Sequence, residues 1–274
     1  MSDRALADVE SIVARVAASR RYRDVDRALV RRMAVEELPR ARNPDDAAKR
    51  VKRRLHQAVG AFARGGPSLD AVARTWRGDL ADPAFRAACV RVMATHASSA
   101  ERAPFLEWFF EPIWAAAGGT PARILDLGCG LGPLALPWMG LAPTAPISAV
   151  DADGSALATV EAFLALVGQP HRTEERDLCT TTIDVPADIA LLLKMVTTLD
   201  RQDAAAAARL VGGLAVRHAV VSFTRRSLGG RTARGMERTY RARMDRLADE
   251  VGAIEVSEAS VPNELVFVVT LAHG

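Results

Sequence analysis

The stretch ILDLGCGLGPLALPW (residues 124–138) decides the fold of this chain. Asp126 is followed by Gly128, Gly130 and Gly132 at alternating positions. An apolar run that ends in glycines predicts a tight turn from a strand into a helix, and glycine lets a ligand approach bare backbone. The dinucleotide fingerprint G-x-G-x-x-G does not match, because the third glycine comes one residue early. The stretch therefore predicts a ligand-binding loop at the end of a buried strand.

The chain after residue 121 alternates between strand-like and helix-like segments. The strand-like runs are ARILDLG (122–128), PISAVDAD (146–153), ADIALLLK (187–194) and RHAVVSFT (217–224). The helix-like segments between them include SALATVEAFLALVG (155–168) and RQDAAAAARLVGGLA (201–215). Such alternation predicts a parallel sheet with helices on both faces. The final pair, GAIEVSEAS (252–260) and NELVFVVTLA (263–272), predicts an antiparallel ending. We expect an α/β, Rossmann-like domain over residues 119–274.

The chain before residue 119 has a helical pattern, and its beginning is basic. Residues 1–66 carry 16 Lys and Arg against 9 Asp and Glu, a balance of +7, whereas the rest of the chain has a balance of −4. The clearest helix lies in NPDDAAKRVKRRLHQAVGAF (43–62), where Asn43 suits the N-cap and Pro44 the first helical position. We predict an all-α domain over residues 1–118 that docks on an anionic partner.

Composition and residue spacing argue against several classes of protein. No apolar run approaches the roughly 18 residues that a membrane span needs, and the first residues lack the pattern of a secretory signal. The cysteines (Cys89, Cys129 and Cys179) are odd in number and far apart, and the five histidines lack metal-ligand spacing. We therefore expect a cytoplasmic protein with no membrane partner and no metal.

The glycine loop resembles motif I of the class I S-adenosylmethionine-dependent methyltransferases, which has the spacing D-x-G-x-G-x-G. In that fold, the cofactor lies at the carboxyl ends of the strands. Asp151 closes the second strand, where it can accept hydrogen bonds from ribose hydroxyls. Asp177 stands before Leu178 after a third strand-like segment, where it can face the adenine amine. The expected cofactor is S-adenosyl-L-methionine.

A second resemblance covers nearly the whole chain. The strings that carry it are SRRY (19–22), KRVKRRLH (49–56), GAF (60–62), HASSAER (96–102), CGLGPLA (129–135), PWMG (137–140), ADIALLLK (187–194), SFTRRSLGGR (222–231), GM (235–236) and NEL (263–265). In this order they resemble the aminoglycoside-resistance 16S ribosomal RNA methyltransferases (Arm/Rmt/Sgm-like) that act on N7 of guanine 1405. Generic methyltransferases lack the basic helical domain.

This resemblance implies roles for individual residues. Arg102 would hold the cofactor carboxylate. The residues that would line the rest of the cofactor are Gly128, Gly130, Asp151, Asp177 and Leu178. The residues that would surround the target guanine are Lys194, Arg226, Arg231 and Met236. The basic helices would contact phosphates of the 30S subunit through Lys49, Arg50, Lys52 and Arg53.

The chemistry implied by the resemblance needs alignment more than it needs a base, because guanine N7 has a free lone pair. Stacking on the target base can come from Arg226 or Arg231, or from the rings of Trp138 and Phe223. Trp138 and Phe223 fit a core position too, and Met236 continues an apolar helical stripe.

The chain departs from the family pattern at a few positions. Gly132 replaces an asparagine, Thr224 replaces a proline, and one extra residue precedes Met236. Two alternatives to the guanine N7 methyltransferase therefore remain open: an RNA methyltransferase that acts on another nucleotide, such as a neighbouring adenine, and a ribosome-binding homologue with little or no turnover.

Overall fold

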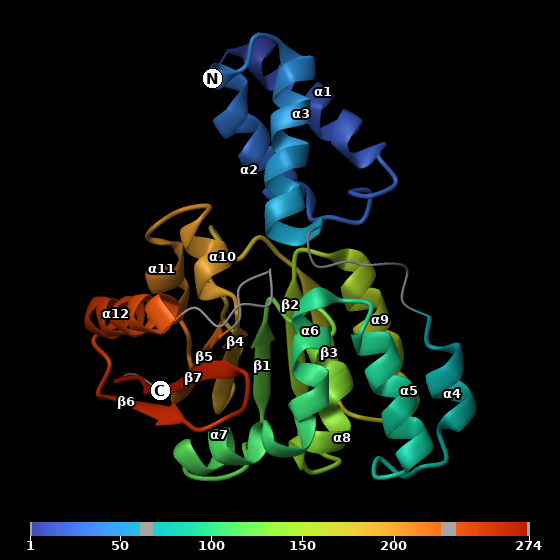
Figure 1. The fold of residues 1–274 in the computed structure, drawn as a ribbon. Coiled ribbons are helices and arrows are strands. Elements are labelled where there is room, and N and C mark those ends of the chain that lie inside the picture. Colours follow the sequence, from blue (N-terminus) through green and yellow to red (C-terminus); the bar gives the residue numbers. More distant parts are fainter. Residues whose placement is uncertain (1, 61–67, 226–233, 273–274) are drawn as a thin grey trace.

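The structure is a computed structural model that describes residues 2–60, 68–225 and 234–272 (Figure 1). It places a small helical bundle above a larger unit built around one mixed sheet. Within the described ranges, no helix is long and apolar enough to cross a membrane. Those same ranges contain no cluster of three or more His, Cys, Asp or Glu side chains suited to a metal ion.

The bundle has its own hydrophobic core. Its helices are α1 (Asp3–Ala17), α2 (Arg27–Glu37) and α3 (Pro44–Leu55), with a short 3₁₀ turn at Leu38–Arg40 and a π-helical turn at His56–Gly60. The predicted cap of α3 is present, since Oδ1 of Asn43 accepts a hydrogen bond from the Asp46 amide at 2.9 Å. Ile12, Met33 and Val51 are fully buried in the bundle core. The bundle therefore packs as a separate unit.

The helices that follow the bundle pack against the sheet instead. They are α4 (Asp70–Thr75), α5 (Pro83–Met93), α6 (Ala97–Arg102), a 3₁₀ segment at Ala103–Trp108 and α7 (Phe110–Ala116). Phe85 and Ile113 from these helices share one hydrophobic core with Ile124 of the first strand. The secondary structure thus changes from helices to α/β alternation near residue 118, but the hydrophobic core continues across this point.

The sheet has seven strands in the order β3-β2-β1-β4-β5-β7-β6. The strands are β1 (Ile124–Leu127), β2 (Ile147–Asp151), β3 (His171–Glu175), β4 (Ile189–Leu193), β5 (His218–Thr224), β6 (Glu255–Ala259) and β7 (Glu264–Thr270). The first five pair in parallel, while β7 pairs antiparallel with both β5 and β6. The predicted doubly wound sheet with an antiparallel ending is confirmed.

Helices cover both faces of this sheet, because neighbouring strand residues point to opposite sides. Ile124 packs into the core with α5 and α7, whereas Leu125 packs into the core on the other face. The helices of this part are a 3₁₀ turn at Gly132–Ala135, α8 (Leu136–Met139), α9 (Gly154–Val167), α10 (Val196–Asp200), α11 (Ala206–Gly212) and α12 (Arg234–Val251).

Strand β3 is not among the four apolar runs of the sequence. Its residues, HRTEE, are mostly polar and half-exposed. It pairs only with β2 and forms one edge of the sheet, so it buries little and needs no apolar pattern.

Candidate active site

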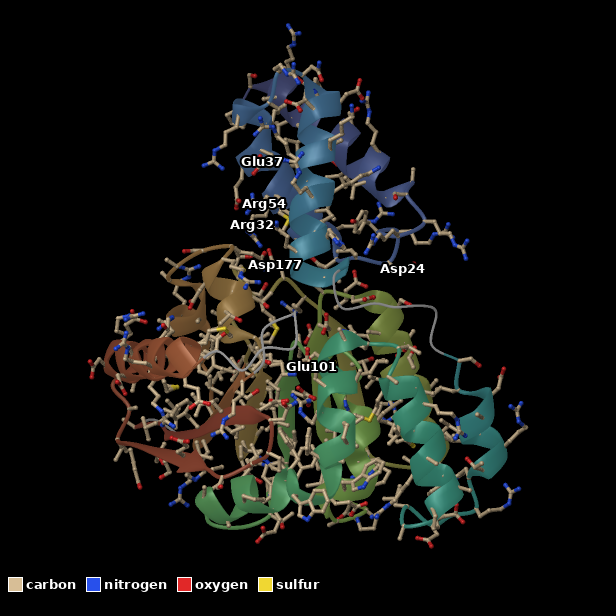
Figure 2. All side chains as sticks on the ribbon, in the orientation of Figure 1. Asp24, Arg32, Glu37, Arg54, Glu101 and Asp177 are labelled. Atoms are coloured by element: carbon tan, nitrogen blue, oxygen red, sulfur yellow. The ribbon has the colours of Figure 1, made fainter. Side chains whose placement is uncertain are left out.

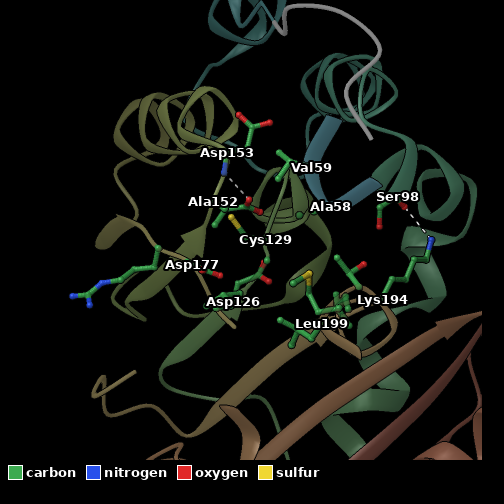
Figure 3. Close-up of a pocket in the computed structure, with 18 of the residues that line it drawn as sticks. Ala58, Val59, Ser98, Asp126, Cys129, Ala152, Asp153, Asp177, Lys194 and Leu199 are labelled. Atoms are coloured by element: carbon green, nitrogen blue, oxygen red, sulfur yellow. Dashed lines mark hydrogen bonds between the residues drawn. The ribbon is translucent and has the colours of Figure 1, made fainter. Parts of the chain in front are cut away.

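A cavity of about 870 Å³, including its mouth, lies at the carboxyl ends of β1 to β4 (Figure 3). The strand ends and the loops after them supply most of its walls, and α6 supplies another. The bundle contributes as well, through Leu29, Ala58 and Val59. The cavity therefore lies where parallel α/β sheets bind ligands, and it is covered from above by the basic helices.

The glycine loop after β1 leaves backbone exposed to this cavity. Gly128 and Gly130 have positive φ values of 67° and 49°, which side-chain-bearing residues rarely adopt. A Cβ atom at Gly130 would lie 2.7 Å from Cε1 of His96. One at Gly132 would lie 3.0 Å from Oδ2 of Asp126. A side chain at 132, such as the asparagine expected from the family pattern, would thus crowd this carboxyl group, and glycine leaves the space open.

Two acids of adjacent strands lie beside this loop. Asp151, at the end of β2, accepts hydrogen bonds from the amides of Gly130 (2.8 Å) and Asp153 (2.9 Å). Burial raises the pKa of Asp151 to about 6, against the lowering effect of these amides. Burial and the nearby Asp151 carboxylate raise the pKa of Asp126 in β1 to about 7, against the lowering effect of Arg102. Asp151 is therefore tied to the glycine loop and aimed into the cavity.

A buried cluster of charges forms the wall opposite these acids. Arg102, at the end of α6, donates through Nε and Nη2 to the carboxylate of Glu264 at 3.1 and 3.2 Å. Nζ of Lys194 lies 2.7 Å from Glu101 and 3.4 Å from Glu264. Glu264 is 1% exposed, and against the cost of burial the cations Arg102 and Lys194 and the Ser222 hydroxyl lower its pKa. Glu264 therefore holds both cations in place.

Lys194 adopts an unusual backbone conformation directly after β4. Its φ is 64°, and its amide donates to the carbonyl and the hydroxyl of Ser222, both at 3.1 Å. A left-handed conformation in a non-glycine residue is costly and persists where the surroundings impose it. The turn aims Nζ at Glu101 and at the Ser98 carbonyl, which lies 3.2 Å away (Figure 3).

Asp177 and Leu178 line the cavity, as the resemblance implies. The Asp177 carboxylate accepts hydrogen bonds from Arg32 of α2 at 2.6 and 3.1 Å, and from the Cys179 amide at 3.1 Å. Nothing in the sequence paired Arg32 with Asp177, because 145 residues separate them.

His96 lies between the glycine loop and the charge cluster, and it is a further site residue that was not among the predicted ones. It precedes the first residue of α6 and lines the cavity. Burial, together with the nearby cations Arg102 and Lys194, lowers the pKa of its imidazole to about 4. His96 is therefore neutral at physiological pH. The strings HASSAER and NEL, which carry the resemblance, contain both His96 and Glu264 and are the signal that points to them.

The four basic residues predicted to bind RNA divide into two groups on α3. Arg50 forms ion pairs inside the bundle, with Asp46 at 3.4 Å and Glu37 at 3.7 Å. Lys49 and Arg53 are exposed and Lys52 is half-exposed. The exposed group is suited to phosphate contacts, whereas Arg50 serves the packing of the bundle.

Of the remaining candidates, the described ones do not line the cavity. Arg226 and Arg231 lie outside the described residues. Met236 lies in the first turn of α12 and is not among the residues that line the cavity. Phe223 is 1% exposed and stacks on Tyr240 at 4.7 Å, so it belongs to the core.

Trp138 lies away from the cavity as well. Its indole N–H donates to Glu107 at 2.7 Å, and Arg86 lies over the ring at 5.3 Å. This ring packs against the core below the glycine loop and does not line the cavity.

Comparison with known proteins agrees with this geometry. A "16S rRNA (guanine(1405)-N(7))-methyltransferase" of Frankia casuarinae is 39% identical, over 95% of this chain and 93% of the relative. A protein of the same name from Micromonospora echinospora is 35% identical, over 95% and 96%. The crystal structure of the 16S rRNA methyltransferase RmtF in complex with S-adenosyl-L-homocysteine is 31% identical, with a TM-score of 0.78 over 99% of this chain and 100% of that chain.

The family profile described as "Ribosomal RNA methyltransferase (FmrO)" matches residues 18–268. The match includes α2 and α3 of the bundle and the strand ends that form the cavity. The chain belongs to the FmrO family of ribosomal RNA methyltransferases.

Proposed function

We propose that this protein transfers the methyl group of S-adenosyl-L-methionine to N7 of guanine 1405 of 16S rRNA in the 30S subunit, and that the modification confers resistance to aminoglycosides. The names of the two relatives support the reaction and the nucleotide. The observation that carries the proposal is the cavity itself, which has the glycine loop on one side and the basic bundle above it. Cofactor and RNA would thus meet at one edge of the sheet.

The groups that line the cavity support this choice of cofactor. The glycine loop has no room for side chains, so its exposed backbone would contact the amino acid end of the cofactor. Arg102 gives two N–H groups to Glu264 and keeps others of its five donors for a carboxylate. Asp151 would accept from the ribose hydroxyls, and Asp177 with Leu178 would hold the adenine. When bound, S-adenosyl-L-methionine supplies a methyl group on a positively charged sulfur.

The residues at the acceptor side suit a target atom that carries its own lone pair. Guanine N7 has no proton to lose, so the site needs to align the base and has no need of a general base. His96 is neutral but enclosed, and the ammonium group of Lys194 forms ion pairs with two carboxylates. Lys194 would lie beside the target guanine. The target guanine has to leave its helix to reach the cavity.

The bundle supplies the contact with the ribosome in this proposal. Lys49, Lys52 and Arg53 would contact phosphates of the folded RNA surface, which carry little sequence information. Recognition of the target would therefore depend on the shape of the subunit and on the base that enters the cavity. We expect the protein to act in the cytoplasm, where the 30S subunit is found.

The test is methylation of purified 30S subunits with labelled S-adenosyl-L-methionine, followed by borohydride and aniline cleavage and primer extension. A single new stop that reports 7-methylguanosine at 1405 is the expected result. Methyl incorporation without this stop would move the target to another nucleotide, with a neighbouring adenine tested first. Tight 30S binding with no incorporation would make the protein a ribosome-binding homologue and direct attention to Gly132 and Thr224.

A further inference from the structure

One arginine of the bundle reaches into the wall of the cofactor cavity. Arg32 of α2 donates from Nε to Oδ2 of Asp177 at 2.6 Å and from Nη2 to Oδ1 at 3.1 Å. Nη2 also lies 2.8 Å from Oε1 of Gln202, which follows α10 and lines the cavity. The side chains of Arg32 and Asp177 are only 15% and 3% exposed. A two-pronged contact of this kind fixes the plane of the carboxylate as well as its position.

The third nitrogen of the Arg32 guanidinium, Nη1, belongs to a series of ion pairs inside the bundle. Nη1 lies 3.1 Å from Glu36, whose other oxygen lies 2.6 Å from Arg54. Arg54 in turn lies 3.2 Å from the buried Glu37. Figure 2 shows Glu37, Arg54, Arg32 and Asp177 following one another from the bundle down to the sheet. Because partners restrain Arg32 on both sides, its guanidinium has little freedom to turn away from Asp177.

A second contact joins the bundle to the neighbouring strand end. The segment before α2 pairs through its backbone with the segment after β2, with a bridge between Val25 and Asp153. The Asp26 amide donates to the Ala152 carbonyl at 2.9 Å, and the Gly154 amide donates to the Asp24 carbonyl at 2.7 Å. The bundle thus forms hydrogen bonds with the segment directly after Asp151 and with Asp177 itself. These are the two acids expected to bind the cofactor nucleoside.

We propose that Arg32 is a positioning residue of the cofactor site. Oδ1 of Asp177 already accepts from Arg32 and from the Cys179 amide, while Oδ2 accepts from Arg32 and has the Thr180 hydroxyl 3.5 Å away. Arg32 turns the carboxylate so that Oδ2 faces the adenine amine, and it holds the bundle in place as one wall of the cavity. A buried carboxylate whose partner is removed must be rehydrated, move or take up a proton, and in each case it accepts a hydrogen bond less well. The inference rests on the proposed function in that the ligand is S-adenosyl-L-methionine.

The experiment compares two ligands by calorimetry on the full chain. One is S-adenosylhomocysteine, and the other is S-inosylhomocysteine, in which a carbonyl replaces the adenine amine. The wild type should prefer the adenosyl ligand, because an acceptor built for an N–H group discriminates against a ligand that lacks it. In Arg32→Ala, affinity for the adenosyl ligand should fall about tenfold and the preference should shrink by a similar factor. A merely structural role would weaken both ligands equally.

Two further variants control the measurement. Arg31→Ala alters the neighbouring arginine on α2, which is exposed and pairs with Glu10 inside the bundle, so both affinities should stay at the wild-type value. Arg32→Lys keeps the charge but loses the two-pronged contact, and its preference should lie between those of wild type and Arg32→Ala. If Arg32→Ala fails to fold, the lysine variant carries the test.

The outcomes separate this inference from the proposed function. If wild type binds the adenosyl ligand and the Arg32 variants keep its full preference, the role of Arg32 is wrong and the proposed function stands. A shrunken preference in a protein that methylates another nucleotide supports the role of Arg32 and overturns the target. A wild type that binds neither ligand overturns both.

Discussion

At the scale of single residues, the glycine loop has the least tolerance for change. Gly130 combines a φ of 49° with a Cβ position 2.7 Å from the His96 ring. We predict that Gly130→Ala lowers affinity for S-adenosylhomocysteine at least tenfold, because the loop or His96 must move into the space of the ligand. Isothermal titration measures this.

Gly168→Ala is the matched control for this prediction. Gly168 also has a positive φ, 73°, but a Cβ there would meet no atom within 4 Å. This variant should lose about 1 kcal/mol of stability from backbone strain and keep its affinity for the ligand. Equal affinity in the Gly130 and Gly168 variants would show that the glycine loop does not enclose the ligand closely.

Asp126 gives the ligand-free protein a pH-dependent stability. Its pKa is about 7 in the folded state, because of burial, against 3.8 as the ordinary value. Between these two pH values only the folded form binds the proton, so stability falls by up to about 1.4 kcal/mol per unit as the pH rises from 3.8 to about 7. Above about pH 7 both forms have lost the proton, and the loss of stability is complete and constant. Urea unfolding at pH 5.5 and pH 8 measures the difference.

Asp126→Asn should remove this part of the pH dependence and unfold at higher urea than wild type at pH 8. The comparison isolates Asp126 from Asp151, whose raised pKa is present in both proteins. An unchanged dependence in the variant would show that Asp126 is hydrated in the folded protein.

At the scale of elements, α3 has one face for packing and one for the ribosome. Arg50 and Arg54 pair with acids of the bundle, while Lys49, Lys52 and Arg53 remain accessible. We predict that reversing the charges of Lys49, Lys52 and Arg53 weakens 30S binding by more than tenfold and makes it less dependent on salt, because each lost phosphate contact lowers the slope by about one. Filter binding across a salt series checks this.

The matched control is Arg217→Glu. Arg217 is exposed and lies just before β5, at the amino ends of the parallel strands, whereas the cavity lies at their carboxyl ends. This variant should leave both the affinity and the salt slope unchanged. The affinity of the α3 variant for S-adenosylhomocysteine should also match wild type, since none of the three residues lines the cavity. Wild-type 30S binding by the α3 variant would rule out this face as the docking surface.

At the scale of the whole molecule, the bundle belongs to two sites at once. It carries the basic face of α3, and it walls the cavity with Leu29, Ala58 and Val59. We predict that docking on the 30S subunit strengthens S-adenosylhomocysteine binding, because the subunit holds the bundle over the cavity. By linkage, the ligand must then strengthen 30S binding by the same factor.

This coupling is measured by titrating each ligand in the presence and absence of the other. An unchanged affinity for each ligand in the presence of the other would mean that the bundle has the same position over the cavity without the subunit.

We propose that residues 3–55 form the docking unit, because the helices from Asp70 onward share the core of the sheet.

The sequence by itself determined the parts of this protein that depend on short stretches of chain. The glycine spacing, the strand-like runs, the cap of α3 and the acid at the end of β2 can all be read locally, because backbone conformation and the period of burial act over a few residues. The resemblance to a family then supplied the expected ligand and target. These features were enough to predict the class of fold and to predict that the site lies at the carboxyl ends of the strands.

Only the tertiary structure decided how distant charges pair. Glu264 holds Arg102 across 162 residues of sequence, and Arg32 holds Asp177 across 145. Arg50 and Lys49 are adjacent in the chain, yet Arg50 forms an ion pair with Asp46 and Lys49 faces outward. Each charge has many possible partners in the sequence, and only the packing of the folded elements against one another brings one of them within hydrogen-bonding distance.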